Sequence, residues 1–145
     1  MTIELSNLFG LRNGRIREVS VGPLNDIGIS HLKSKTDDVR LTHKQLLHID
    51  KHGGIDDFGI IAIPFGLNYG MFIGEHASPN HLIITYVYPD NNIRYKAVVK
   101  TARGGEELWL CTFHRMRPRQ TKDLLKRGYV VKSLTQKFLA SERLA

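Results

Sequence analysis

The sequence predicts an α+β domain: N-terminal helices packed on a twisted antiparallel sheet of four to five strands, with a further helix near the C-terminus. Two observations predict this class. A capped helical pattern comes before a series of β-like segments, and short turn sequences separate those segments. The 145 residues are 41% hydrophobic and 24% charged, which suits one domain with a single core.

The first part of the chain, residues 1–38, is expected to be an irregular leading segment with one or two short elements. Within it, Asn13–Arg15 is a turn signal, and residues 16–22 alternate as a short strand does. Residues 24–35 are consistent with a short helix. We therefore expect the core of the domain to begin near residue 39.

A clearer helix is predicted over residues 42–52. Thr42 and Gln45 have the capping-box spacing, and an apolar stripe of leucine and isoleucine follows. The Gly53–Gly54 pair is a typical helix end.

The sequence then changes to strand-like segments. Three of the separators, HASPN, PDNN and ARGGE, are turn sequences of hairpin length, so the strands should form an antiparallel meander. The predicted strands are 58–65, 69–75, 81–89, 93–101 and 107–116.

The last predicted helix lies in RQTKDLLKRGYVV, with Thr121 as its N-cap and Gly128 just past its end. A short strand or tail follows. The expected organisation is one domain over 1–145, with a core at 39–131 and a C-terminal tail at 132–145.

The net charge is the most informative bulk property. Lysine and arginine total 21 against 14 acidic residues, which gives a net charge of +7 and a pI near 9.7. Most of the excess lies after Arg94, and a local basic patch attracts a polyanion such as nucleic acid. The alternative is a protein whose basic charge is incidental.

Cysteine content and hydropathy indicate the cellular compartment to expect. The only cysteine, Cys111, excludes an internal disulfide and a cysteine-rich zinc site, and it suits a reducing cytosol. Its neighbours Trp109 and Phe113 favour a packed thiol over a nucleophile. No apolar run is long enough to cross a bilayer and the first residues lack a signal-peptide pattern, so we expect a cytoplasmic protein with no membrane partner.

Alternation assigns the polar residues of the strand over 93–100 to one face. Its two rows are Ile93, Tyr95, Ala97 and Val99, expected in the core, and Arg94, Lys96, Val98 and Lys100, expected outside. The simplest role for the lysines is to keep a sheet face soluble.

The strand over 107–116 gives no such clear answer, because both of its rows begin apolar. Its end turns polar, with Thr112 and His114 in one row and Arg115 in the other. Hairpin pairing brings Lys96 or Arg94, rather than Lys100, nearest to His114. A histidine that only bonds its neighbours remains the alternative there.

Two histidines on the first helix, His48 and His52, are one turn apart and share a side. The sequence HIDKH differs from the metalloprotease pattern HExxH, and no third residue stands at a spacing typical of a metal ligand. We expect neither a metal nor a cofactor. A structural pair and a catalytic or RNA-contacting histidine remain the two other interpretations.

These residue types are sufficient for metal-free RNA cleavage. The reaction needs a base for the 2′-hydroxyl proton, an acid for the 5′-oxygen, and cations beside the phosphorane oxygens. Histidine suits the first two roles, and lysine or arginine suits the third. A threonine hydroxyl can donate to a phosphate oxygen.

The segments LTHKQLLHIDKHG, YKAVVKTARGGEELWLCTFHRM and TKDLLKRGYVV resemble the phage-associated nuclease-like domains of the BECR superfamily, which groups barnase, EndoU, the RNA-cleaving colicins and RelE. The resemblance spans roughly residues 40–131. It is carried by Tyr95, Ala97, Val98, Val99, Lys100, Glu107, Leu108, Thr112, Phe113, His114 and Arg115.

The resemblance implies a metal-independent endoribonuclease, as a toxin or phage effector that cuts tRNA or another RNA by 2′-hydroxyl attack. It also implies RNA and a neutralising immunity or antitoxin protein as partners. The catalytic candidates are His52, Lys100, Thr112 and His114, and the RNA-binding candidates are His48, Lys96, Arg115, Lys122, Lys126 and Arg127.

Two hypotheses from other classes remain open. The first is a non-catalytic nucleic-acid-binding or phage accessory protein that uses the same basic face. The second is a protein-interaction module whose charge is incidental.

Overall fold

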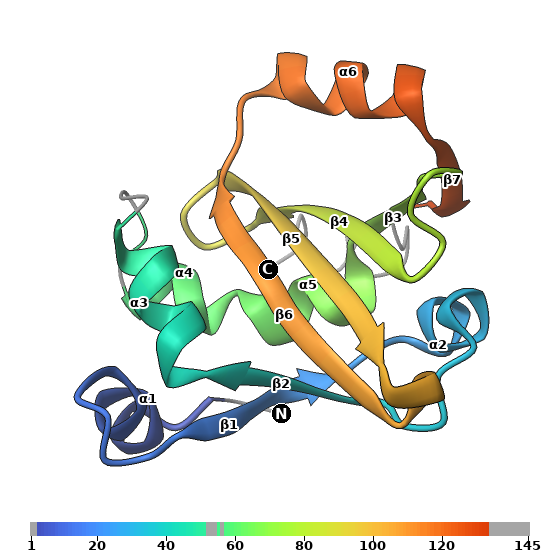
Figure 1. Ribbon diagram of the computed structural model, residues 1–145. Coiled ribbons are helices and arrows are strands. Elements are labelled where there is room, and N and C mark those ends of the chain that lie inside the picture. Colours follow the sequence, from blue (N-terminus) through green and yellow to red (C-terminus); the bar gives the residue numbers. More distant parts are fainter. Residues whose placement is uncertain (1–2, 52–54, 56, 134–145) are drawn as a thin grey trace.

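A seven-stranded mixed sheet with helices on both faces forms the framework of the chain (Figure 1). The computed structural model describes residues 3–51, 55 and 57–133. The elements in chain order are α1 (Leu5–Arg12), β1 (Glu18–Pro23), α2 (Asp26–Leu32), β2 (Asp38–Thr42), α3 (His43–Lys51), α4 (Asp57–Ile61), α5 (Ile63–Tyr69), β3 (Met71–Gly74), β4 (His81–Tyr88), β5 (Ile93–Ala102), the 3₁₀ turn η1 (Arg103–Gly105), β6 (Glu107–Arg115), α6 (Pro118–Arg127) and β7 (Tyr129–Lys132).

The α+β class is confirmed, but the expected sheet of four to five antiparallel strands is wrong in two respects. The strand order is β1-β2-β6-β5-β4-β3-β7, so three further strands extend the β3–β6 meander. In addition, β2 and β6 run parallel. The segment 1–38, expected to be largely irregular, supplies α1, β1 and α2.

The predicted strand over 58–65 is also wrong, since this segment lies in α4 and α5. Pro64 stands at the start of α5, where its missing N–H and fixed φ favour a helix. Ile60 and Ile63 are fully buried among the core side chains. The other predicted strands correspond to β3, β4, β5 and β6.

The helix ends follow local capping chemistry. Thr42 caps α3 as predicted, because its Oγ1 accepts the Gln45 amide at 3.1 Å. The predicted N-cap of the last helix is wrong, since Thr121 is buried inside α6. Arg117 precedes α6 instead, and its amide donates to Gln120 Oε1 at 2.7 Å.

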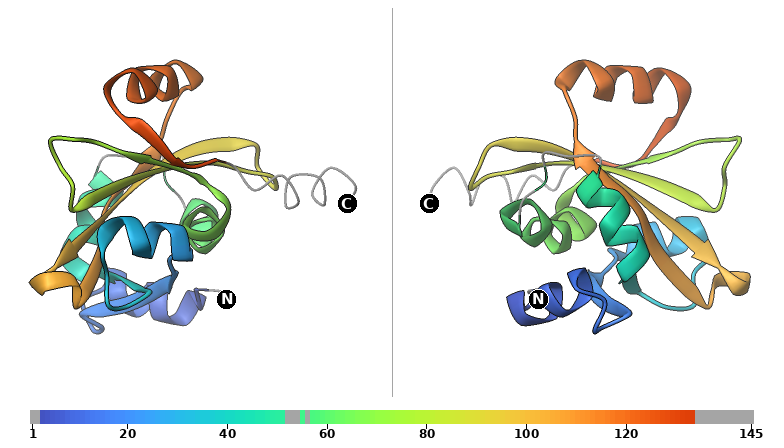
Figure 2. Two further views of the ribbon diagram at one scale, coloured as in Figure 1. Left: turned by 90° about the vertical axis from the view of Figure 1, so that its right-hand side faces the viewer. Right: turned by 60° about the vertical axis from the view of Figure 1, so that its left-hand side comes forward.

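Two apolar clusters lie on opposite faces of the sheet. The large core packs α1, α2, α3 and α5 against one face, and its buried side chains include Tyr95, Val99 and Phe113. On the other face, Leu124 of α6 and Met116 pack in a small cluster with Ile73 and Ile83. Helix α6 lies on this side of the sheet, opposite the other helices (Figure 2). We call this second face the outer face. None of the described helices is long and apolar enough to cross a lipid bilayer.

A β-bulge in β6 decides which side chains reach the outer face. Val98 pairs with Thr112 and Val99 pairs with Leu110, so Cys111 is an extra residue in the ladder. Leu110 and Phe113 are both buried although they are three residues apart. The bulge therefore explains why simple alternation could not identify the buried row of this strand.

Candidate functional site

The candidate site is the part of the outer face formed by β5 and β6. Strand pairing places Lys96 opposite His114, and Val98 opposite Thr112. Side chains directly opposite on one face have Cβ atoms about 4.5–5.5 Å apart. The sequence left Lys96 or Arg94, rather than Lys100, as the residue nearest to His114, and the strand register selects Lys96.

Thr112 stands between two lysines. Its direct partner is Val98, so Lys96 and Lys100 are its diagonal neighbours, at about 7–8 Å between backbone positions. Lys96, Thr112 and His114 form a compact group, and Lys100 is next along β5. All four side chains are partly exposed. The register thus brings four candidates from the sequence onto one surface.

The charge of Lys100 affects the pKa of Cys111, the extra residue of the bulge. Burial raises the pKa of the Cys111 thiol, and the positive charge of Lys100 partly offsets that rise. The Cys111 thiol also lies 3.7 Å from the Trp109 carbonyl oxygen. This environment keeps the thiol protonated, in agreement with a packing role for the cysteine.

A hydrogen bond fixes the tautomer of His114. Its Nδ1 lies 2.7 Å from the Arg115 carbonyl oxygen. Because a carbonyl can only accept, Nδ1 carries the hydrogen, and the Nε2 of the neutral ring keeps its lone pair. An imidazole in this state can take a proton at Nε2.

Helix α3 lies beside the open edge of β6 (Figures 1 and 2). Strand β2 pairs with β6 only through Val39 and Arg40. Farther along, the Gln45 side-chain amide donates to the Cys111 carbonyl of β6. His48 is three residues after Gln45, on the same side of the helix, and is exposed. This side of α3 therefore brings an imidazole toward the end of β6. His52 lies outside the described residues.

Helix α6 covers the other half of the outer face. Ile83 and Thr85, which project from β4 on this face, are only 4% and 1% exposed. Lys122, Lys126 and Arg127 are exposed on α6. The outer face is therefore closed over β3 and β4, where Ile83 and Thr85 are buried, and open over β5 and β6, where the polar side chains are partly exposed. The basic helix α6 lies on this side of the sheet (Figure 2).

Arg115 does not join this group. It pairs with Tyr95, whose side chain is buried in the large core, so Arg115 projects to the opposite side of the strand end. Arg115 instead lines a cavity at the β6–α6 junction with Arg117 and Arg119. Sequence reasoning counted the last two only as part of the basic excess.

Two outer-face residues were also missed. Trp109 pairs with Lys100 and is partly exposed, so it offers an aromatic surface beside that lysine. His81 pairs with Lys100 from β4. Counting the register back through the PDNN turn is the signal that would have placed His81 on the polar row. With strands about 4.8 Å apart and a rise of about 3.3 Å per residue, about 16 Å separates the backbones of His81 and His114.

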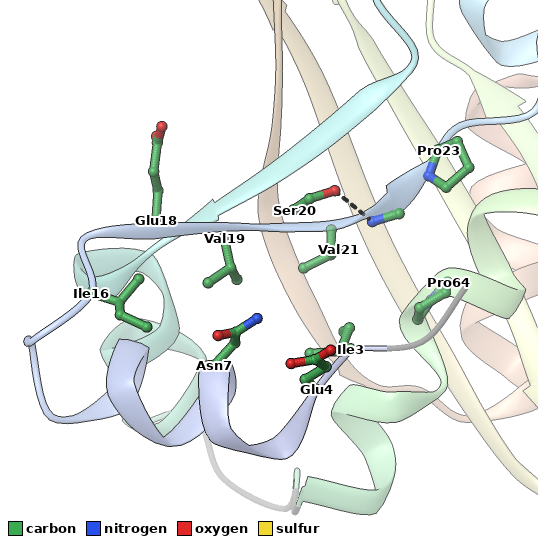
Figure 3. A pocket seen from close by; sticks show the side chains of 11 residues that line it. Ile3, Glu4, Asn7, Ile16, Glu18, Val19, Ser20, Val21, Pro23 and Pro64 are labelled. Atoms are coloured by element: carbon green, nitrogen blue, oxygen red, sulfur yellow. Dashed lines mark hydrogen bonds between the residues drawn. The ribbon is translucent and has the colours of Figure 1, made fainter.

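Lysine and arginine side chains gather on β5 and α6, where Lys96, Lys100, Lys122, Lys126 and Arg127 are partly or fully exposed. On β2, Arg40 is paired with Glu18 at 3.4 Å and with Asp38 at 3.0 Å. A cavity of about 500 Å³ between α1 and β1 is lined by Glu4 and Glu18 and by no lysine or arginine (Figure 3). That cavity is electrostatically unsuited to a phosphate.

Metal ligation finds no support among the described residues, where no group of three His, Cys, Asp or Glu side chains is arranged to hold an ion. Comparison of the chain with protein-family models, with curated proteins and with solved structures finds no match.

Proposed function

We propose that the protein is a metal-independent endoribonuclease that binds RNA on the open half of its outer face. The observation that carries the proposal is the pairing of Lys96 with His114, with Thr112 and Lys100 beside them. A general base, two cations and a hydroxyl donor on one exposed surface are the groups that 2′-hydroxyl attack needs. The resemblance of residues 40–131 to the BECR superfamily supports the same reaction.

His114 would act as the base in this mechanism. Its Nε2 takes the proton of the 2′-hydroxyl as the 2′-oxygen bonds to phosphorus, and the bond from phosphorus to the 5′-oxygen breaks. The products are a 2′,3′-cyclic phosphate and a 5′-hydroxyl. Lys96 and Lys100 stabilise the charge on the non-bridging oxygens, and the Thr112 hydroxyl donates to one of them.

The leaving 5′-oxygen needs a proton from a second group. His81 is too distant to serve the same phosphate as His114, as the separation of about 16 Å indicates. A protonated histidine of α3 is the better candidate, because His48 stands one turn beyond the Gln45 contact with β6. His52 remains a candidate from the sequence.

The test is cleavage of total tRNA and of an unstructured RNA in the presence of EDTA. We expect His114→Ala to lose about 10²-fold or more of the activity, the usual contribution of a general base. His81→Ala is the matched control, since it removes an imidazole from the same face at a distance, and it should retain activity within a few-fold. Fragments should end in a 2′,3′-cyclic phosphate.

Absence of cleavage on every RNA would overturn the enzyme proposal. Tight, strongly salt-dependent RNA binding without cleavage would then favour the second candidate, a non-catalytic nucleic-acid-binding module. That candidate is favoured by the open character of the β5–β6 surface and by partly exposed Trp109, on which a base can stack. Equal losses in His81→Ala and His114→Ala would contradict the assignment of the base.

A further inference from the structure

The junction between β6 and α6 contains a cavity of about 860 Å³, whose lining includes Arg115 but not His114. This volume is within the range of roughly 300–1,000 Å³ that small-molecule sites occupy. Its lining residues are Ile93, Arg115, Met116, Arg117, Pro118, Arg119 and Gln120.

Three guanidinium groups give the cavity its charge. Arg115, Arg117 and Arg119 are exposed, and within the described part of the chain none of them forms an ion pair. By contrast, Arg12 is held by Asp50 at 3.0 Å. No carboxylate lines the cavity. These guanidinium groups are therefore available to an anion. A guanidinium group can donate two parallel hydrogen bonds to the oxygens of one phosphate.

The remaining wall is apolar and held in place. Met116 is 7% exposed, and its amide donates to the Arg94 carbonyl at 3.0 Å. Ile93 is partly buried against the large core. The Arg117–Gln120 hydrogen bond fixes the start of α6 beside them. A rigid apolar wall next to free guanidinium groups suits a ligand with one flat apolar part and one anionic part.

We propose that this cavity binds a phosphorylated nucleotide. The phosphate would be held by the arginines, while the base lies against Ile93 and Met116 or stacks on a guanidinium plane. This proposal rests on the proposed function only in identifying the nucleotide as part of an RNA. His114 and Arg115 are consecutive in β6 and face opposite sides. An RNA strand passing around the end of β6 would therefore reach both sites.

Binding of adenosine 5′-monophosphate to the full chain tests the proposal, measured by isothermal titration calorimetry at low salt, with adenosine as the uncharged comparison. We expect the monophosphate to bind at least about tenfold more tightly than adenosine, because charge-assisted hydrogen bonds depend on the phosphate. The Arg117→Ala/Arg119→Ala variant should lose at least about tenfold of that affinity.

The matched control is Arg15→Ala/Arg17→Ala. It removes two exposed arginines at the same spacing, and the same net charge, from the loop between α1 and β1. This control should change the affinity less than about twofold if the binding is local. Circular dichroism spectra of both variants should match that of the parent protein.

Three results would overturn the site: no binding of the monophosphate, equal binding of adenosine, or an equal loss in the control variant. The outcome is separable from the proposed function. Monophosphate binding by a chain that cuts no RNA would support the cavity and contradict the nuclease. RNA cleavage by a chain that does not bind the monophosphate would support the nuclease and contradict the cavity.

Discussion

Deleting Cys111 should leave the protein folded, although it removes a residue from a central strand. A deletion inside a regular strand moves every later side chain to the opposite face. In β6 the extra residue Cys111 already reverses the alternation of faces between Leu110 and Thr112. Without Cys111, the sequence Leu110-Thr112-Phe113-His114 alternates regularly, and each side chain keeps the face it has in the structure. The deletion therefore removes the bulge and leaves the faces unchanged.

The cost of this deletion follows from the contacts of Cys111. Its thiol is partly buried, and its carbonyl accepts the Gln45 amide. A hydrogen bond of this kind contributes about 0.5–1.5 kcal/mol, and the ladder gains regular pairing in return. We therefore expect a loss of about 1–2 kcal/mol in the free energy of unfolding.

Deleting Val98 from β5 is the contrasting case. If the strand beyond it shifts, Val99 leaves a fully buried position and Lys100 turns toward the core. Exposing a buried valine costs about 1.5 kcal/mol or more, and burying an ammonium costs several more. A loss of at least about 5 kcal/mol is comparable with the whole stability of a small domain, so this variant should not fold.

Deleting Thr112 instead of Cys111 gives a matched functional control. Cys111 then occupies the position opposite Val98, so the two deletion variants have the same strand pattern and differ in one side chain. Both should unfold in urea at similar midpoints. The variant that keeps Thr112 should cut RNA at least about tenfold faster, because its hydroxyl can donate to a phosphate oxygen. Failure of the Cys111 deletion to fold, or equal cutting by both variants, would refute this reasoning.

Three further predictions concern side chains near the site and in the supporting clusters. Lys100→Met should slow alkylation of Cys111 by iodoacetamide at pH 8, because loss of the positive charge raises the thiol pKa further; an unchanged rate would contradict the proximity. Burial lowers the pKa of His31, so the folded state favours its neutral form. Stability should therefore fall as the pH drops below about 6.5, where the unfolded chain takes up the proton. The melting temperature of His31→Leu should depend less on pH over 7.0–5.0 than that of the parent protein, and an equal dependence would contradict this role of His31. Leu124 of α6 is 7% exposed and packs toward the sheet, so Leu124→Ala should cost about 2 kcal/mol in urea unfolding. A cost near zero would mean that other contacts hold α6 on the sheet.

The meander of β3 to β6 was accessible from the sequence because it is built from local signals. The turn after β5 illustrates this, since Gly104 and Gly105 both have positive φ, at 65° and 94°. The β2–β6 pair was not accessible, because it joins residues far apart in the sequence through only two parallel positions, Val39 and Arg40. The prediction of a strand over 58–65 was wrong for another reason, because a short apolar run fits either a strand or a buried helix. Pro64, which stands at the start of α5, is the residue that favours the helix.

The polar group of the candidate site, Lys96, Lys100, Thr112 and His114, was predictable from the sequence, whereas Trp109 and His81 beside it were not. Alternation along β5 correctly separated Lys96 and Lys100 from the core. It misaligned Thr112 and His114 with Leu110, because a bulge is a property of the pairing of two strands rather than of one sequence pattern. Arg115 lies on the face opposite to Thr112 and His114, as alternation at this end of the strand predicted. A single-residue change of phase thus decided which polar side chains could act together.

The bulge and helix α6 together account for the location of the polar group. Leu124 and Met116 cover β3 and β4 on the outer face, where Ile83 and Thr85 are buried. A histidine or lysine at those positions would lose most of its hydration. Over β5 and β6 the face stays open, so Lys96 retains access to solvent and to a ligand. If α6 were displaced by Leu124→Ala without unfolding the sheet, the Lys96–His114 pair should persist, while any contribution of the α6 cations to RNA affinity should be lost.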